Sequence, residues 1–330
     1  MNTFFEQLTT QFGPIIIGTI MISLPLLITA IGGFFSEKSG VINIGLEGMM
    51  IFGAFFGTLV LNFVSGLEWY IVLILGLIVA IISSLITGLL HAILSIKFQI
   101  NQVIVGTAIN LISPAFVFFL MNSIYGRDET NSISLNSETF QVLNGGIVSL
   151  EKIVLCLIIL LICFISLFIF SKTKFGKYII AVGENPIASA TAGLDVIKIR
   201  YKAVLISSAL AGIGGYAMVV LIGGRMNTTL IAGYGFLALA ILIFSGWNIK
   251  KCFVGSFIFG LFIALVPSLN TIIGGMQLEN SFIKQEDLQG IINLILETGP
   301  YIIVILILII FSNKKTAPKS LGESFEIEKR

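Results

Sequence analysis

Charged residues are scarce in this chain. Lys, Arg, Asp and Glu together make up 11% of its 330 residues, whereas a soluble domain carries about 25%. The apolar set AVILMFWYC makes up 56% of the chain, and the mean hydropathy is +1.05. So few charges cannot cover the surface of a water-soluble globule. The composition therefore excludes a soluble protein and indicates an integral membrane protein with many spans.

Residues that carry catalytic and metal chemistry are almost absent. The chain has one histidine, His91, and three cysteines, Cys156, Cys163 and Cys252, which all lie in apolar runs without metal-ligand or disulfide spacing. We interpret the cysteines as small packing residues and His91 as an interfacial residue. No GxxxxGK[ST] phosphate loop, HExxH motif or nucleophile–base pair occurs. The sequence predicts no catalysis by this chain, no cofactor and no metal.

An excess of basic charge is also lacking. The formal net charge is +2, and the basic residues are scattered between apolar runs, which excludes a nucleic-acid-binding face. Residues 1–13 contain neither Lys nor Arg, so the basic region of a cleaved signal peptide is missing. We expect the first apolar run to remain in the mature protein.

Long apolar runs account for most of the sequence. Each is about 20 residues long, the length that a helix needs to cross about 30 Å of hydrocarbon. The expected spans are 14–34, 41–64, 70–95, 102–124, 151–171, 203–223, 230–247, 251–270 and 288–312. The pattern predicts an all-α polytopic membrane bundle of nine to ten segments, forming one transmembrane domain over residues 1–330. Because the second run begins with polar and Gly-rich residues, we expect a broken or re-entrant helix near 40–50.

The basic residues are distributed unevenly along this topology. With nine crossings, 15 of the 19 Lys and Arg residues fall on one side, mainly in 172–202, at 250–251 and in the tail 313–330. Cytoplasmic loops carry the excess of Lys and Arg in membrane proteins. The pattern therefore predicts a cytoplasmic loop over 172–202, a cytoplasmic C-terminal tail over 313–330 and an extracellular N-terminus.

Two clusters of polar residues lie within the expected membrane spans, where burying a polar side chain in hydrocarbon costs free energy. The first, in SGVINIGLEGMM (39–50), contains Asn43 and Glu47, which share one face if the segment is helical. These residues could line a pathway, or the segment could be an interfacial loop with Glu47 solvated or paired with Lys38. The second cluster includes Gln102 and Asn110, two helical turns apart. They could line the same pathway or form hydrogen bonds between helices, worth about 0.6 kcal/mol each on average.

A short helix is expected within the basic loop. Asn185 is a good N-cap, Pro186 suits the first helical position, and Gly193 suits the position after the last turn. The Ala-rich stretch between them is too short to span a membrane. It could dock a soluble partner, or it could be an amphipathic interfacial helix.

Four segments resemble one known family. They are SEKSGVINIGLEGMM (36–50), NQVIVGTAINL (101–111), VGENPIASATAGLDV (182–196) and AGYGFLALAILIFSGWN (232–248), in the expected order. They look like the permease subunits of nucleoside-type ABC importers, which belong to the group that also contains permeases for simple sugars and branched-chain amino acids. The form NIGLEG favours the nucleoside branch. The sequence departs from the pattern at Asn248, which is not followed by the Pro often found there.

The resemblance implies an alternating-access importer in the cell membrane that takes up a small polar solute. Among the solutes of this family it favours nucleosides. It implies that the pathway is lined by Asn43, Glu47, Gln102 and Asn110. It also implies that the ATPase docks on Glu184, Asn185, Pro186, Ala188, Ala192 and Gly193. The implied partners are a separate ATP-binding subunit, a second permease in a heterodimer, and an extracellular substrate-binding lipoprotein.

Three alternatives stay open at this point. The solute could be a simple sugar or a branched-chain amino acid, because neutral amides suit sugars as well as nucleosides. The chain could instead be an ion-coupled secondary transporter with Glu47 as its proton or cation site. It could also be a purely structural membrane subunit, in which case Asn43 and Glu47 would be dispensable for transport.

Overall fold

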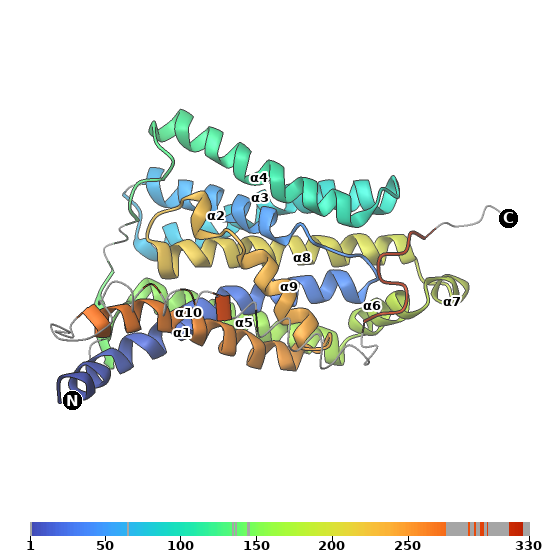
Figure 1. The fold of residues 1–330 in the computed structure, drawn as a ribbon. Helices are drawn as coiled ribbons and strands as arrows, with labels where there is room; N and C mark the ends of the chain where they lie inside the picture. Colours follow the sequence, from blue (N-terminus) through green and yellow to red (C-terminus); the bar gives the residue numbers. More distant parts are fainter. Residues whose placement is uncertain are drawn as a thin grey trace.

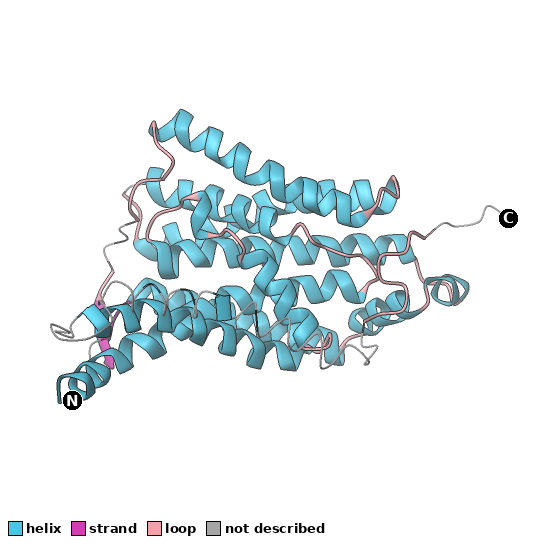
Figure 2. Cartoon of the chain, viewed as in Figure 1, coloured by secondary structure: helices cyan, strands magenta, loops and turns pink. Residues whose placement is uncertain are grey.

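The computed structural model of the chain is a bundle of long helices (Figures 1 and 2). The structure describes residues 2–274 except 65, 134, 136, 144 and 145, then residues 290, 294, 298, 299 and 302, and finally 317–325. The elements are α1 (Asn2–Lys38), α2 (Leu46–Phe63), α3 (Trp69–Ala92), η1 (Ile93–Lys97), α4 (Gln102–Tyr125), β1 (Thr139–Leu143), β2 (Gly146–Ser149), α5 (Leu150–Lys172), α6 (Lys174–Glu184), α7 (Pro186–Thr191), α8 (Val196–Met218), η2 (Val219–Gly223), η3 (Thr228–Leu230), α9 (Tyr234–Phe244) and α10 (Ile249–Gly274).

Seven helices in the described part of the chain are long and apolar enough to cross a membrane. They are Thr10–Lys38, Leu46–Phe63, Trp69–Lys97, Gln102–Tyr125, Leu150–Lys172, Val196–Gly223 and Ile249–Ile272. They correspond to seven of the predicted spans, so the all-α polytopic membrane bundle is confirmed. Of the predicted span 288–312 the structure describes only residues 290, 294, 298, 299 and 302, and of the tail 313–330 only residues 317–325.

The predicted span 230–247 is wrong in its length. In place of a full crossing, the structure has the short helix η3 and then α9, which has 11 residues. A helix of that length extends about 16 Å, half the thickness of the hydrocarbon layer. The interruption lies at Gly233, whose φ of 86° breaks the helical path. Hydropathy did not predict this break because Gly-Tyr-Gly does not interrupt the apolar pattern.

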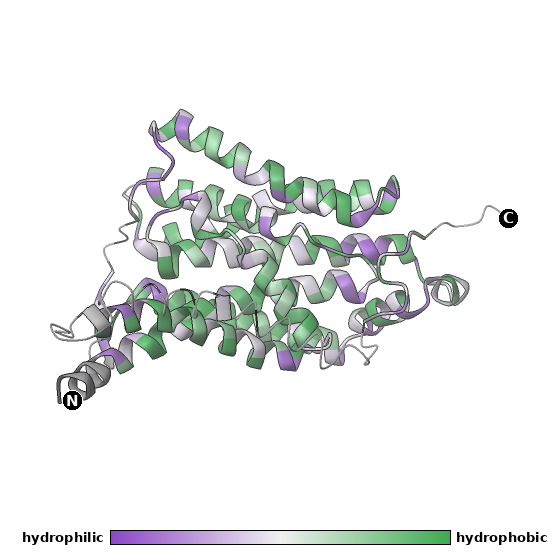
Figure 3. Cartoon of the chain, viewed as in Figure 1, coloured by the Kyte–Doolittle hydropathy of each residue, from purple (hydrophilic) through white to green (hydrophobic). Residues whose placement is uncertain are grey.

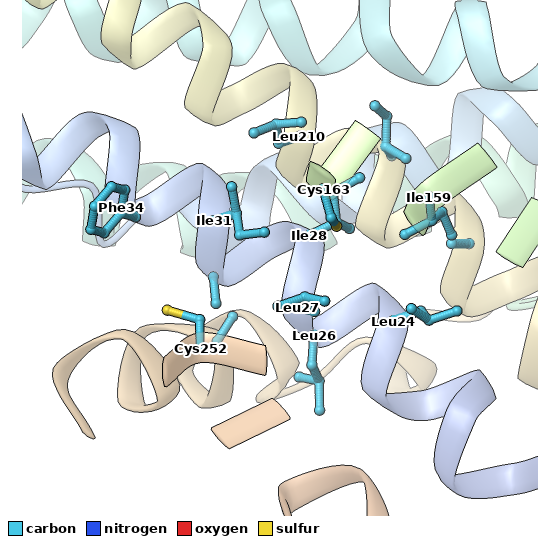
Figure 4. Packing of buried hydrophobic residues seen from close by; sticks show 14 of the residues in the cluster. Leu24, Leu26, Leu27, Ile28, Ile31, Phe34, Ile159, Cys163, Leu210 and Cys252 are labelled. Atoms are coloured by element: carbon cyan, nitrogen blue, oxygen red, sulfur yellow. The ribbon is translucent and has the colours of Figure 1, made fainter. Parts of the chain in front are cut away.

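Helices α1 and α8 run through the centre of the bundle. Apolar side chains of α1, among them Leu27 and Ile31, pack against α5, α8 and α10 (Figure 4). On α8, a Cβ at Gly212 would lie 2.7 Å from the Ala80 carbonyl of α3, and one at Gly215 would collide with the Met50 carbonyl of α2. The small residues of α8 therefore allow the close helix approach that lipid-embedded packing favours.

The two ends of the bundle differ. The hairpin β1–β2 and the start of α1 lie at one end, and α6, α7 and residues 317–325 lie at the other (Figure 1). Hydrophilic residues gather towards both ends, and hydrophobic residues follow the helices between them (Figure 3). Helices α1 and α5 end at Lys38 and Lys172 beside α6. We call the end with α6 and α7 the basic end, and its orientation in the membrane remains a prediction.

Candidate translocation site and partner-binding segment

The chain leaves helix α1 at the basic end through a glycine turn. Gly40 has a φ of 92°, and its N–H donates to the Glu37 carbonyl at 2.9 Å. The N–H of Val41 donates to the Ser36 carbonyl at 3.2 Å. This pair of bonds is the Schellman arrangement, in which glycine at the left-handed position ends the helix. The turn directs the chain back into the bundle.

Residues 39–45 then run into the bundle without forming a helix, and α2 begins only at Leu46. We call residues 39–45 the unwound segment. Its backbone polar groups need partners because non-helical backbone at membrane depth is tolerated only where protein or water covers it. Gln102 Oε1 accepts a hydrogen bond from the Ile42 N–H at 2.7 Å. His91 Nε2 lies 3.1 Å from the Ile42 carbonyl oxygen.

Asn110 on α4 holds the next part of the backbone. Its Oδ1 accepts a hydrogen bond from the Gly48 N–H at 2.9 Å, and its Nδ2 donates to the Ile44 carbonyl at 2.8 Å. Between these contacts α4 comes very close, because a Cβ at Gly106 would lie 2.9 Å from the Gly45 nitrogen. The polar face predicted on α4 is therefore the face that supports the unwound segment.

Asn43 lies at the centre of the unwound segment and is fully buried. Its Nδ2 donates to Ser207 Oγ on α8 at 2.9 Å. Its Oδ1 is buried and has no hydrogen-bond partner among the described residues. A buried acceptor without a partner costs free energy, so this oxygen is a polar atom that the packing leaves unpaired.

Glu47 lies where the two interrupted helices meet. It belongs to the first turn of α2, and its carboxyl group faces the backbone N–H groups of Gly233 and Phe236 at the start of α9. A Cβ at Gly235 would collide with the Glu47 backbone, so α9 can approach only with glycine there. The N–H groups at the start of α9 favour a charged Glu47 carboxyl group, whereas burial opposes the charge, and Oε2 is buried without a hydrogen-bond partner among the described residues.

The structure thus brings together the side chains of Asn43, Glu47, Gln102 and Asn110 around one stretch of non-helical backbone. Gln102 and Asn110 form hydrogen bonds between segments, and Glu47 faces α9. Glu47 forms no ion pair with Lys38 within the described residues. The lining of a solute pathway by these residues stays a prediction.

Several residues of this region do not stand out in the sequence. His91 is fully buried in the protein, and its ring supports the unwound segment, while its predicted place at the membrane interface stays a prediction. Ser207 and Arg200 on α8 were also missed, although both contact residues 39–43. The sequence does not show which residue a polar side chain in a span will contact when that partner is 100 or more residues away along the chain. The one available signal was the presence of His and Arg in so apolar a protein, because an ionisable side chain within a membrane span costs free energy and therefore indicates a specific role.

The predicted docking helix is present at the basic end as α7. Asn185 Oδ1 accepts a hydrogen bond from the Ala188 N–H at 2.9 Å, Pro186 begins the helix, and Gly193 follows it with a φ of 86°. Glu184, Asn185, Ala188, Ala192 and Gly193 are exposed, and Pro186 is half-buried. Ile187 is 70% exposed. Beyond the helix, a hydrogen bond from Lys198 lowers the pKa of exposed Asp195, and the two side chains form an ion pair at 2.9 Å.

These features define a class of protein: a polytopic membrane bundle with two interrupted helices that meet inside it and a small capped helix exposed at one end. Residues 15–311 match the family described as branched-chain amino acid transport system / permease component. The chain belongs to this family of transport-system permease components.

Similar proteins come from several bacteria. The chain is 32% identical to the nucleoside ABC transporter permease protein NupC of Lactococcus lactis over 94% of this chain and 96% of NupC. It is 35% identical to the guanosine ABC transporter permease protein NupQ of Bacillus subtilis over 96% of this chain and 97% of NupQ. A second Lactococcus lactis nucleoside permease, NupB, is 28% identical over 58% of this chain and 55% of NupB. The chain is accordingly a transport subunit of an ABC system and not the subunit that hydrolyses ATP.

Proposed function

We propose that the chain is one of two permease subunits of an ATP-driven nucleoside importer. The observation that supports nucleosides best is the near full-length similarity to NupC and NupQ, which are named for nucleosides and guanosine. The site is compatible with such a solute. Nucleosides are neutral and rich in hydrogen-bonding groups, and Asn43 Oδ1 is an acceptor without a partner among the described residues, which a solute reaches only when the surrounding segments separate.

The pathway runs beside the unwound segment, with Asn43, Glu47, Gln102 and Asn110 as the residues that position or contact the solute. The support is their convergence on a break in two helices, because substrate sites in transporters typically form at interrupted helices near the middle of the membrane. With 11 residues helix α9 is about 16 Å long, about half the thickness of the hydrocarbon layer, so a helix that starts at the membrane surface on the basic end has its N-terminus near the middle of the membrane.

The partners follow from the same comparison and from α7. A separate ATP-binding subunit docks on Glu184, Asn185, Pro186, Ala188, Ala192 and Gly193, so the basic end is cytoplasmic. The second permease is a different chain, since Lactococcus lactis has both NupC and NupB and this chain aligns with them over 94% and 58% of its length. An extracellular lipoprotein delivers the solute.

Transport in proteoliposomes tests the function. The purified complex of this chain with the second permease and the ATPase is supplied with ATP, the binding lipoprotein and labelled guanosine, adenosine, ribose or leucine. We expect ATP-dependent uptake of the nucleosides and background uptake of ribose and leucine. Preferential uptake of ribose or leucine would replace the nucleoside assignment. Uptake driven by an ion gradient without ATP would instead establish the secondary transporter.

Crosslinking tests the docking site. The variant Ala188→Cys places a thiol on exposed α7, where we expect a bifunctional thiol reagent to link it to the ATPase. Leu67→Cys is the matched control, because Leu67 is 49% exposed at the opposite end of the bundle. A link from position 67, or no link from position 188 in an assembled complex, would refute the assignment.

A further inference from the structure

A short segment near the C-terminus crosses the basic end of the bundle. Residues 317–325 form a turn that lies beside the end of α6 and the beginning of the unwound segment (Figure 1). Pro318 and Ser320 within it are buried, although the segment belongs to no helix or strand. We call residues 318–323 the clasp. Buried irregular backbone needs specific partners, and those partners identify what the clasp connects.

The first connection is to the end of α6. The N–H of Ser320 donates to the Gly183 carbonyl at 3.0 Å, and Ser320 Oγ donates to the same oxygen at 2.7 Å. Ser320 is only 3% exposed. Gly183 lies in the last turn of α6, two residues before the N-cap of α7. The clasp therefore grips the backbone that carries the proposed ATPase-docking helix.

The second connection is to the unwound segment. The N–H of Gly322 donates to the Gly40 carbonyl at 2.9 Å. A Cβ on Gly322 would lie 2.8 Å from Ile42 Cδ1, so the clasp also packs against the residue whose backbone Gln102 and His91 hold. One turn of chain is thus fastened both to the docking segment and to the entry of the site.

Arg200 on α8 forms hydrogen bonds both to the clasp and to the unwound segment. Its Nη1 donates to the Glu323 carbonyl at 2.9 Å, and its Nε donates to the Ser39 carbonyl at 3.2 Å. Arg200 is 2% exposed, and its Nη2 is buried without a hydrogen-bond partner among the described residues. A buried arginine held by backbone carbonyls costs more desolvation free energy than an apolar residue would. This cost indicates a role beyond simple packing.

We propose that the clasp, held by Arg200, transmits displacement of α6 and α7 to the unwound segment and so couples the ATPase to the solute site. The inference rests on the proposed function, because it needs α7 to be the docking helix. Hydrogen bonds to three separate elements make the clasp move with any of them. When an ATPase displaces α7, Gly183 pulls Ser320, and Gly322 displaces Gly40 and the backbone that follows it.

The test compares two serines of the same segment. Ser320→Ala removes the side-chain bond to Gly183, whereas Ser324→Ala, at an exposed position four residues on, is the matched control. We expect Ser320→Ala complexes to copurify with the ATPase and keep ATP hydrolysis within twofold, while the ATP hydrolysed per nucleoside imported rises at least fivefold. Ser324→Ala should leave this ratio unchanged.

Arg200→Lys provides a second variant, because lysine keeps the charge but loses the planar fork of donors. We expect it to uncouple hydrolysis from import in the same way. Wild-type ratios in both variants would refute the clasp. Loss of ATPase copurification in either variant would also refute it, because the segment would then serve docking and not transmission.

Hydrogen exchange separates failure of the clasp from failure of the proposed function. In the wild-type complex, addition of ATP and vanadate should change amide exchange in both α7 and residues 39–45. In Ser320→Ala, which keeps the main-chain bond to Gly183, α7 should respond as in the wild type while the response of residues 39–45 is weaker. A wild-type complex in which residues 39–45 do not respond refutes the clasp even if nucleosides are imported. If the exchange responds as expected but nucleosides are not imported, the solute assignment fails and the clasp stands.

Discussion

Trp247 donates a 2.6 Å hydrogen bond from Nε1 to Glu37 Oε2, across 210 residues of chain. Glu37 is 5% exposed and precedes the glycine turn at the end of α1, while Trp247 has a φ of 52° in the turn between α9 and α10. This bond fixes the basic end of interrupted helix α9 to the helix that leads into the unwound segment. Both interrupted elements are therefore anchored to the end of α1.

Trp247→Phe should destabilise the protein by about 1–3 kcal/mol, because a buried acceptor loses its donor. The measurement is unfolding in mixed detergent micelles. In a Glu37→Leu background the same change should cost much less, since removing both partners of a hydrogen bond can be nearly neutral. Additive costs in the double variant would show that the bond contributes nothing. Trp69→Phe, at the opposite end of the bundle, is the control.

Asn110 and Asn122 offer a matched pair on α4. Asn110 holds the Ile44 carbonyl and the Gly48 N–H, whereas exposed Asn122 donates only to the Phe118 carbonyl of its own helix. Asn110→Ala should cost about 1–3 kcal/mol for each backbone group left without a partner and lower nucleoside uptake at least tenfold. Asn122→Ala should change stability by less than about 0.5 kcal/mol and leave uptake intact. Equal effects at the two positions would contradict the supporting role of Asn110.

Glu47 distinguishes the proposed importer from an ion-coupled transporter. Glu47→Gln keeps an acceptor opposite the N–H groups of Gly233 and Phe236 but cannot bind and release a proton. In an ATP-driven importer this variant should retain uptake within a few-fold, while Glu47→Ala loses at least 90% of it. Uptake is measured against ATP and against an imposed pH gradient. Complete loss in Glu47→Gln would favour a titrating site.

Helices were predictable from the sequence where a continuous apolar run is long enough to cross the membrane. The α7 helix was predictable too, because its start and stop depend on local signals: Asn185 as cap, Pro186 and Gly193. Helix caps of this kind depend on hydrogen bonds and backbone angles within one turn of the chain, so the sequence alone indicates them. The break at Gly233 was not predictable, since the sign of φ at a glycine leaves no mark on hydropathy.

The network around the unwound segment was predictable only in part. The spacing of Gln102 and Asn110 identified a polar face on α4, but it did not indicate that the amides bind the backbone of residues 42–48. The contacts of His91 and Arg200 were missed because each joins segments far apart in sequence. These contacts depend on how the helices pack against one another, and that packing cannot be deduced from a single sequence.

The cap of α7 offers the most local test of docking. Asn185→Ala removes the hydrogen bond to the Ala188 N–H, and loss of an N-cap costs about 0.5–2 kcal/mol. A six-residue helix has little to offset that loss. We expect about a threefold to thirtyfold weaker affinity for the ATPase, measured by titration in detergent.

Asn185→Ser should restore most of the affinity, because serine caps helices almost as well as asparagine. The distinction matters because a direct contact from the Asn185 amide to the ATPase would predict the opposite. In that case Ser and Ala would weaken binding equally. Rescue by serine would show that the ATPase recognises the folded helix, with exposed Ile187 presented on it, and not the asparagine itself.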